Sequence, residues 1–185
     1  MGRCVVFRFI KLRRSEPTET VAQRNSDDNE VRHMDFKAPR PLQTEHEELH
    51  IELERATKVN GKVGEEARNV AKLMHPHFLK EERYAMPPLG LLRLLLESRV
   101  TPEMGGILRI TDRLEAELPD MIEEHQALFG ALRRLAVVAL QENRPAIADF
   151  ADKMRLHAET EEEVLYPAAI LVGRYVKALL QVNRV

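Results

Sequence analysis

The chain has 185 residues, of which 44% are hydrophobic, 31% charged and 5% aromatic, and its 28 Lys and Arg against 30 Asp and Glu give a formal net charge of −2. This length predicts a single domain. So balanced a charge creates no field that would attract nucleic acid, and the longest uncharged run, the 10 residues from Val164 to Gly173, is too short to cross a bilayer. We therefore expect neither nucleic-acid binding nor a membrane-spanning role.

Cysteine usage and overall composition narrow the class further. The single cysteine, Cys4, allows neither an internal disulfide nor a thiolate metal site, which favours a reducing, cytoplasmic location and leaves only nitrogen and oxygen ligands for a metal. Few aromatic residues, only 8 glycines and many Leu, Ala, Glu and Arg are typical of long helices. The composition predicts an all-α fold.

The N-terminal segment, residues 1–40, is predicted to be a disordered or poorly ordered extension. Its start is basic, but Arg8 interrupts the apolar run that a secretory signal requires, and Val6 does not fit the myristoylation pattern. The part after Arg14 is polar and shows no hydrophobic period. Met34 is an alternative natural start, and residues 41–185 are the predicted domain.

Beyond Pro41, apolar residues recur at intervals of three and four, the pattern of helices with one buried face. The first stripe comprises Leu42, His46, Leu49, Leu53 and Ala56. A capping box from Thr44 to Glu47 predicts where this helix begins, and Asn60-Gly61 where it ends. The second stripe comprises Val63, Ala67, Val70, Met74, His77, Glu81 and Tyr84. Pro76 is expected to kink the second helix, which should end at Pro87.

Two further stripes complete the pattern. The third comprises Ile107, Ile110, Leu114, Leu118, Met121, His125, Leu128, Leu132, Leu135 and Ala139, and the fourth comprises Ile147, Phe150, Met154, His157, Glu161, Val164, Ala168 and Leu171. Pro119 should bend or interrupt the third helix, which leaves a separate helix before Leu118 as an alternative to one continuous helix. Pro167 should bend or break the fourth. Four such helices can bury their stripes only against each other, which predicts an antiparallel, up-and-down four-helix bundle.

Each stripe contains a histidine where the period calls for an aliphatic residue, and two stripes also contain a glutamate. The resulting candidate metal ligands are His46, His77, Glu81, His125, His157 and Glu161. Burying an unpaired carboxylate costs several kcal/mol, and unsatisfied imidazoles cost roughly 1–3 kcal/mol each. A metal-free core of His–Glu hydrogen bonds is one way to offset this cost, but so many converging donors favour bound cations.

An internal repeat supports a paired site. His77-x3-Glu81-Glu82 matches His157-x3-Glu161-Glu162 at a shift of 80 residues, and the Glu-His pair ending at His46 matches the one ending at His125 at a shift of 79. This period suits a duplicated helical hairpin. Because each hairpin supplies two histidines and one glutamate, we expect two metal ions side by side.

The stretch from Leu42 to Gly173 resembles the hemerythrin-like HHE cation-binding domains. The two His-x3-Glu-Glu motifs carry the resemblance, and the segment 75–82 followed by Pro87-Pro88-Leu89-Gly90 is similar to bacterial members. The resemblance implies a hemerythrin-like bundle around two non-haem irons bridged by carboxylates. In that scheme the terminal ligands are His46, His77, His125 and His157, and the bridges are Glu81 and Glu161.

One departure from the family pattern bears on activity. Oxygen-carrying hemerythrins take a further histidine from a His-x3-His pair in the third helix, whereas Met121 and Phe129 flank His125 here at that spacing. The site therefore offers more open coordination positions than a carrier. That favours members that sense iron, oxygen or nitric oxide, or that reduce peroxide, over reversible oxygen carriage.

Several neighbouring residues have weaker claims to the site. His50, one turn after His46, could supply a further ligand, but Glu47 and Glu54 make it look like a helix-flank residue. His75 should face away, because two residues turn a helix by about 200°. Tyr84 could either hydrogen-bond to a ligand or simply pack in the core.

Glu82 and Glu162 lie beside the predicted bridges but turn off the stripes, so they are read as solvated flank residues.

Iron fits the set of four nitrogens and two oxygens better than zinc, which prefers a closed shell of four ligands, and manganese is a further alternative. Three functions use these same ligands: a di-iron protein that binds or senses oxygen, nitric oxide or iron; a small di-iron peroxidase or oxidase; and an iron-responsive interaction module without catalysis. The expected partner is a small diatomic or peroxide ligand, and the sequence does not identify a protein partner.

Overall fold

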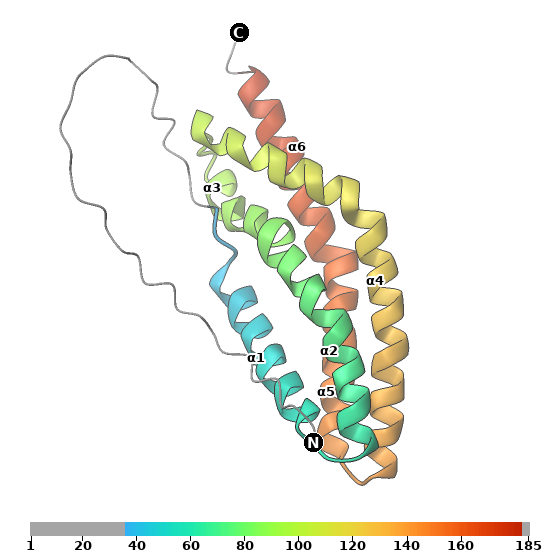
Figure 1. Ribbon diagram of the computed structural model, residues 1–185. Helices are drawn as coiled ribbons and strands as arrows, with labels where there is room; N and C mark the ends of the chain where they lie inside the picture. The colour runs from blue at the N-terminus through green and yellow to red at the C-terminus, as the bar shows by residue number, and fades with distance from the viewer. Residues whose placement is uncertain (1–35, 183–185) are drawn as a thin grey trace, which may run out of the picture. The chain divides into compact units, whose positions relative to one another are not determined.

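A computed structural model describes residues 36–182 of the chain (Figure 1). The predicted extension 1–40, apart from its last five residues, and the alternative start at Met34 lie outside the described residues. In chain order the elements are α1 (Arg40–Thr57), α2 (Lys62–Lys80), η1 (Glu81–Ala85), η2 (Pro87–Leu91), α3 (Leu92–Leu96), η3 (Pro102–Gly106), α4 (Ile107–Gln141), α5 (Pro145–Thr160), η4 (Glu161–Leu165) and α6 (Tyr166–Val182).

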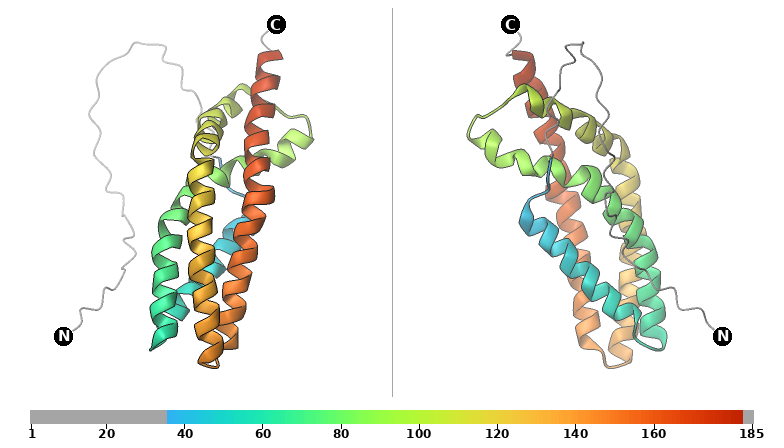
Figure 2. Two further views of the ribbon diagram at one scale, coloured as in Figure 1. Left: turned by 90° about the vertical axis from the view of Figure 1, so that its right-hand side faces the viewer. Right: turned by 60° about the vertical axis from the view of Figure 1, so that its left-hand side comes forward.

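Four long helical stretches make up the bundle. They are α1, α2 with η1, α4, and the stretch of α5, η4 and α6, while the part of the chain that the structure describes has no β-strand. α4 packs against α2, α5 and α6, and α1 packs mainly against α2. Figure 2 shows α1 inclined to the other three stretches. The predicted all-α four-helix bundle is confirmed.

The first two stripes are buried as the sequence predicts, except that Leu42 is only partly buried. Leu49, Leu53 and Ala56 of α1 are buried, and so is every member of the second stripe. The predicted capping box is wrong, because α1 begins at Arg40 and Thr44 lies within it. Pro41 in the first turn explains the earlier start. Amide hydrogens in the first turn of a helix have no partner within the helix, so a proline, which has no amide hydrogen, loses nothing there.

Of the two outcomes predicted for the third helix at Pro119, a bend or an interruption, the interruption does not occur. α4 runs without interruption from Ile107 to Gln141 with Pro119 inside it, so no separate helix precedes Leu118. Figure 1 shows this helix bending along its length. The connector before it is ordered into short turns, η2, α3 and η3, whose residues Leu91 and Met104 are buried.

Two π-helical turns, η1 and η4, distinguish the structure from a regular bundle. Each begins at one of the candidate bridging glutamates, and each is closed by an i to i−5 backbone bond. Met86 donates its N–H to the Glu81 carbonyl, and Tyr166 donates to the Glu161 carbonyl. Each turn also precedes a proline, whose ring would clash with the carbonyl four residues back in a regular helix. The wider turn relieves this clash and inserts one extra residue.

The extra residue changes which side chains face the core after Glu161. The predicted stripe members Val164 and Leu171 are instead 55% and 60% exposed. Tyr166, Ala169 and Val176 are buried in their place. The fourth stripe is therefore correct as far as Glu161 and wrong beyond it.

Apolar clusters lie on both sides of the histidines and glutamates along the bundle. One includes Phe78, Leu128 and Met154, and the other includes Leu114 and Met121. The polar donors are thus enclosed by packed hydrocarbon. Among the described residues, no helix combines the length and apolar character needed to span a membrane.

Candidate metal centre

The structure brings all six candidate ligands together in the interior of the bundle. Each is at most 5% exposed. Their donor atoms form two groups, in each of which the atoms lie within 4.8 Å of one another: His77, Glu81, His125 and Glu161, and His46, His157 and Glu161. We call these the first and the second donor group. α1, α2, α4 and α5 each supply one histidine, so the centre depends on all four helices of the bundle.

The two glutamates lie between the two pairs of histidines. Glu161 belongs to both groups: its Oε1 is 3.1 Å from His157 Nε2 and its Oε2 is 3.7 Å from His125 Nε2. Glu81 likewise directs Oε1 to His77 Nε2 at 3.0 Å, while its Oε2 lies 3.8 Å from His46 Nε2. Each carboxylate thus faces both groups, so each would be able to contact an ion in either group.

Hydrogen bonds within the protein do not satisfy this cluster. Glu81 Oε2 is buried and has no hydrogen-bond partner among the described residues. The hydrogen bond of 3.2 Å between the Nε2 atoms of His46 and His157 leaves that oxygen without a partner. A buried carboxylate oxygen left without a partner carries a large desolvation cost. A donor set of imidazole nitrogens and carboxylate oxygens with this deficit fits a bound cation.

Three of the four histidines turn their other nitrogen to a carboxylate on the periphery. Nδ1 lies 2.7 Å from Glu124 Oε2 in His77, 2.9 Å from Glu162 Oε1 in His125 and 3.3 Å from Glu45 Oε1 in His157. Such contacts fix the ring orientation and direct Nε2 to the cluster. The interpretation of Glu162 as a solvated flank residue is therefore wrong.

The fourth histidine departs from this pattern. His46 Nδ1 has no hydrogen-bond partner among the described residues, and its ring packs against Phe78 with the centroids 4.6 Å apart. By the internal repeat its carboxylate would come from Glu82, the counterpart of Glu162, but Glu82 is exposed. The contacts of His77 and His157 with their outer carboxylates thus correspond in the two hairpins. The contact of His125 with Glu162 has no counterpart at His46.

Charges in the cluster are distributed unevenly among the histidines. Burial lowers the pKa of His77, but hydrogen bonds to Glu81 and Glu124 outweigh it and raise the pKa to about 9. The same balance between burial and Glu161 raises the pKa of His157 to about 9. Burial and the neighbouring charge of His77 lower the pKa of His125 to about 4. Two protons thus reside where cations would bind.

The two carboxylates also differ. Burial raises the pKa of Glu81, and the negative charge of Glu161 raises it further. For Glu161, burial is outweighed by hydrogen bonds from His157 and His46, which lower its pKa to about 2. Glu161 is therefore the permanent anion of the cluster, and the charge on Glu81 depends on a nearby positive charge.

Tyr166 reaches into the first donor group and was missed by the sequence analysis. Its hydroxyl donates to Glu81 Oε1 at 2.5 Å and lies 3.3 Å from His77 Nε2 and 3.5 Å from His125 Nε2. Burial, followed by the charges of the two glutamates, raises the pKa of this phenol. Tyr166 follows Glu161 by five residues, a spacing that shares a face only where the helix is π, so a 3.6-residue period could not find it.

The residues with weaker claims lie outside both donor groups. His75 is exposed, as predicted. His50 is half-buried and packs against Phe78 with the ring centroids 4.5 Å apart. The Tyr84 hydroxyl donates to Glu117 Oε2 at 2.5 Å, so its hydrogen bond points away from the cluster.

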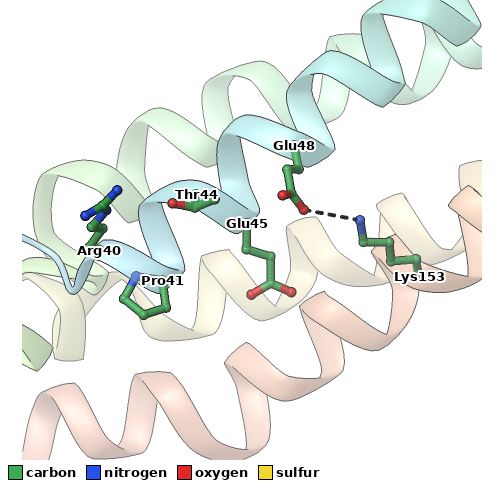
Figure 3. A pocket seen from close by; sticks show the side chains of 6 residues that line it. All are labelled: Arg40, Pro41, Thr44, Glu45, Glu48 and Lys153. Atoms are coloured by element: carbon green, nitrogen blue, oxygen red, sulfur yellow. Dashed lines mark ion pairs between the residues drawn. The ribbon is translucent and has the colours of Figure 1, made fainter.

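A surface cavity of about 550 Å³ lies between α1 and α5. It is lined by residues of α1 and by Lys153 of α5. Figure 3 shows Glu45 extending from α1 toward the neighbouring helical stretch, and Glu48 paired with Lys153. Because Glu45 also contacts His157 Nδ1, a single side chain connects the cavity to the centre.

A helical bundle whose four helices each contribute a histidine to a buried, carboxylate-containing centre is the architecture of a metal-binding bundle protein. The comparison with known families specifies the class. The chain belongs to the family described as "Hemerythrin HHE cation binding domain", which matches residues 38–169, and the predicted resemblance is confirmed. Neither curated proteins nor solved structures gave a match to the chain.

Proposed function

We propose that this protein binds two non-haem iron ions at a carboxylate-bridged centre. The centre either binds or senses oxygen or nitric oxide, or it senses iron through its own occupancy. The proposed ligands are His46, His77, Glu81, His125, His157 and Glu161. The observation that carries the proposal is the position of Glu161, whose two oxygens face different donor groups. A single-ion site would need no carboxylate placed between two pairs of histidines.

The donor chemistry supports iron over the alternatives. Imidazole and carboxylate ligands suit ferrous and ferric iron, while zinc favours a closed tetrahedral shell and manganese favours more oxygen. Bound iron would supply reversible one-electron chemistry and open coordination positions for a small ligand. The chain's own residues hold the ions, orient the imidazoles through the outer carboxylates and exclude bulk water with the two apolar clusters.

The number of protein donors favours binding or sensing over carriage. Met121 and Phe129 lie one helical turn before and after His125, and neither offers a nitrogen ligand. The second donor group also has fewer donors than the first. We infer that a diatomic molecule or peroxide binds in the open positions. With its single cysteine, the chain suits the reducing cytoplasm.

The test is metal analysis combined with absorption spectroscopy. The full chain is loaded with ferrous iron without oxygen, its metal content is measured, and it is then exposed to oxygen, nitric oxide or peroxide. We expect about two irons per chain and absorption changes that reverse when the gas is removed. Sustained loss of peroxide would instead indicate a di-iron peroxidase.

A third outcome would favour the non-catalytic module. In that case iron would change the thermal stability strongly, but no gas or peroxide would change the spectrum. Failure to bind iron under any of these conditions would contradict the proposed function.

A further inference from the structure

The phenol oxygen of Tyr166 lies among the donor atoms of the first group. Its distances to Glu81 Oε1, His77 Nε2 and His125 Nε2 are 2.5, 3.3 and 3.5 Å. The Tyr166 ring is buried in the cluster that also contains Leu114 and Met121. A phenol whose only role was to anchor the helix would need one partner, but this one faces three candidate ligand atoms.

These distances are those of neighbouring ligands around one ion. Nitrogen and oxygen donors bind transition metals at about 2.1 Å, so adjacent donors at right angles lie about 3 Å apart. The separation between His77 Nε2 and Glu81 Oε1, 3.0 Å, fits this value. The contacts of the Tyr166 oxygen scatter around the same value, so it lies where a further ligand of that ion would lie.

We propose that Tyr166 is a metal ligand, giving the first donor group a phenol oxygen in addition to His77, Glu81, His125 and Glu161. This inference rests on the proposed function and deepens it, because it makes the two ions unequal. When the oxygen coordinates ferric iron, it does so as the phenolate, and its proton is released to solvent.

The second donor group has no equivalent oxygen. At the shift of 80 residues that relates the hairpins, the counterpart of Tyr166 is Met86, whose thioether is a poor ligand for ferric iron. No tyrosine oxygen contacts His46 or His157 among the described residues. The ion of the second group is therefore the one with open positions, on the side where Glu45 borders the surface cavity.

The experiment uses the ferric colour of the iron-loaded full chain. After anaerobic loading with ferrous iron and conversion to the ferric state with a chemical oxidant that is then removed, phenolate coordination gives a charge-transfer band in the visible range, with phenolate vibrations enhanced in resonance Raman spectra. Tyr166→Phe removes only the hydroxyl, and we expect it to abolish the band. Tyr84→Phe is the matched control, since it removes another buried hydroxyl whose hydrogen bond goes to Glu117, and it should keep the band.

A second variant keeps the test decisive if Tyr166→Phe does not fold. The chain has three tyrosines, so the combined variant Tyr84→Phe and Tyr175→Phe retains Tyr166 alone, and we expect it to keep the band. Loss of the band in this variant, or its persistence in Tyr166→Phe, overturns the proposed ligand. Wild-type protein that binds iron without phenolate signals also refutes the ligand but leaves the proposed function intact. Wild-type protein that binds no iron refutes both.

Discussion

At the scale of single residues, the outer carboxylates decide what the buried histidines can do. An imidazole has two nitrogens, and the one that faces the cluster can bind a cation only if the other nitrogen carries the proton. Glu124 meets this need for His77, and Glu162 meets it for His125. Lys80 in turn donates to Glu124 and holds it in place. The orientation of the buried histidines therefore depends on charged groups nearer the surface.

We expect Glu124→Ala to weaken iron binding by about 10- to 100-fold, the usual cost of removing such a partner from a ligating histidine. His77 would lose the contact that orients its ring, while its Nε2 would remain in the cluster. The measurement is a competition titration with a chelator of known affinity. Glu123→Ala is the control, because Glu123 is the exposed neighbour of Glu124. Equal iron affinity in the two variants would contradict a role for Glu124.

The ligand assignment itself can be tested with two histidines that are close in sequence. His77→Ala should lower the iron content sharply because it removes a donor from the first group. His75→Ala should leave the content unchanged, since His75 is exposed on the opposite side of the helix. Metal analysis of the purified variants decides the matter. If both retain wild-type iron, the assignment of His77 is wrong.

The six candidate ligands could be found from sequence because each stands in a helical stripe where an aliphatic residue is expected. The structure brings them together, and their role as ligands stays a prediction. Glu162 and Tyr166 could not be found in this way. Glu162 lies off the stripe and acts across the bundle on His125. The repeated Glu-His pairs were the available signal for Glu45 and Glu124, but that signal does not say which histidine each carboxylate contacts.

At the scale of elements, the two π turns explain where the periodic prediction ends. A fixed period of 3.6 residues describes α5 as far as Glu161, and then one inserted residue rotates the rest of the helix. Pro167 was visible in the sequence and predicted a bend or a break. The structure instead has a wider turn and no break, and α6 continues packed against α4, a contact that no local pattern shows.

The contact between α6 and α4 can be tested at a glycine. A Cβ on Gly173 would lie 2.1 Å from Thr111 Oγ1 and 2.6 Å from its Cβ, so the two helices would have to separate. We expect Gly173→Ala to lower the free energy of unfolding by about 1–3 kcal/mol through overpacking, despite the better helix propensity of alanine. Urea denaturation followed by circular dichroism measures the change.

Gly130→Ala is the matched control within a helix. A Cβ there would meet only the end of the Arg134 side chain at 3.7 Å, so alanine should be neutral or stabilise by up to about 1 kcal/mol. If Gly173→Ala were as stable as Gly130→Ala, the close packing of α6 on Thr111 would be contradicted.

At the scale of the whole molecule, the centre makes stability depend on what occupies it. Without a cation, the two carboxylates are offset by protons on His77 and His157, whose pKa values are raised to about 9. A bound cation would replace these protons and remove the unpaired state of Glu81 Oε2. Ligands that bind the folded state alone stabilise it by mass action. Iron should therefore raise the unfolding temperature and change its dependence on pH.

The metal-free protein should lose stability as the pH rises from 6.5 to 9. A folded-state pKa above the unfolded value of 6.5 gives a stabilisation that is complete below pH 6.5 and is lost as the pH passes through about 9. Shifts of this size correspond to about 3 kcal/mol for each of the two histidines. Glu81, whose pKa is also raised, acts in the same direction.

The other groups of the cluster do not mask this trend. His125, with a pKa of about 4, is neutral in the folded state throughout this range, so its contribution changes little once the pH exceeds the unfolded pKa of 6.5. Glu161, with a pKa of about 2, loses its contribution only below pH 4.5. Urea denaturation in the presence of a chelator, at pH values between 6.5 and 9, measures the decline. In the iron-loaded protein the ligating nitrogens carry no proton, so the same pH series without the chelator should be flat. A metal-free series as flat as the loaded one would show that His77 and His157 are not protonated in the folded chain, and the charge balance derived for the centre would then be wrong.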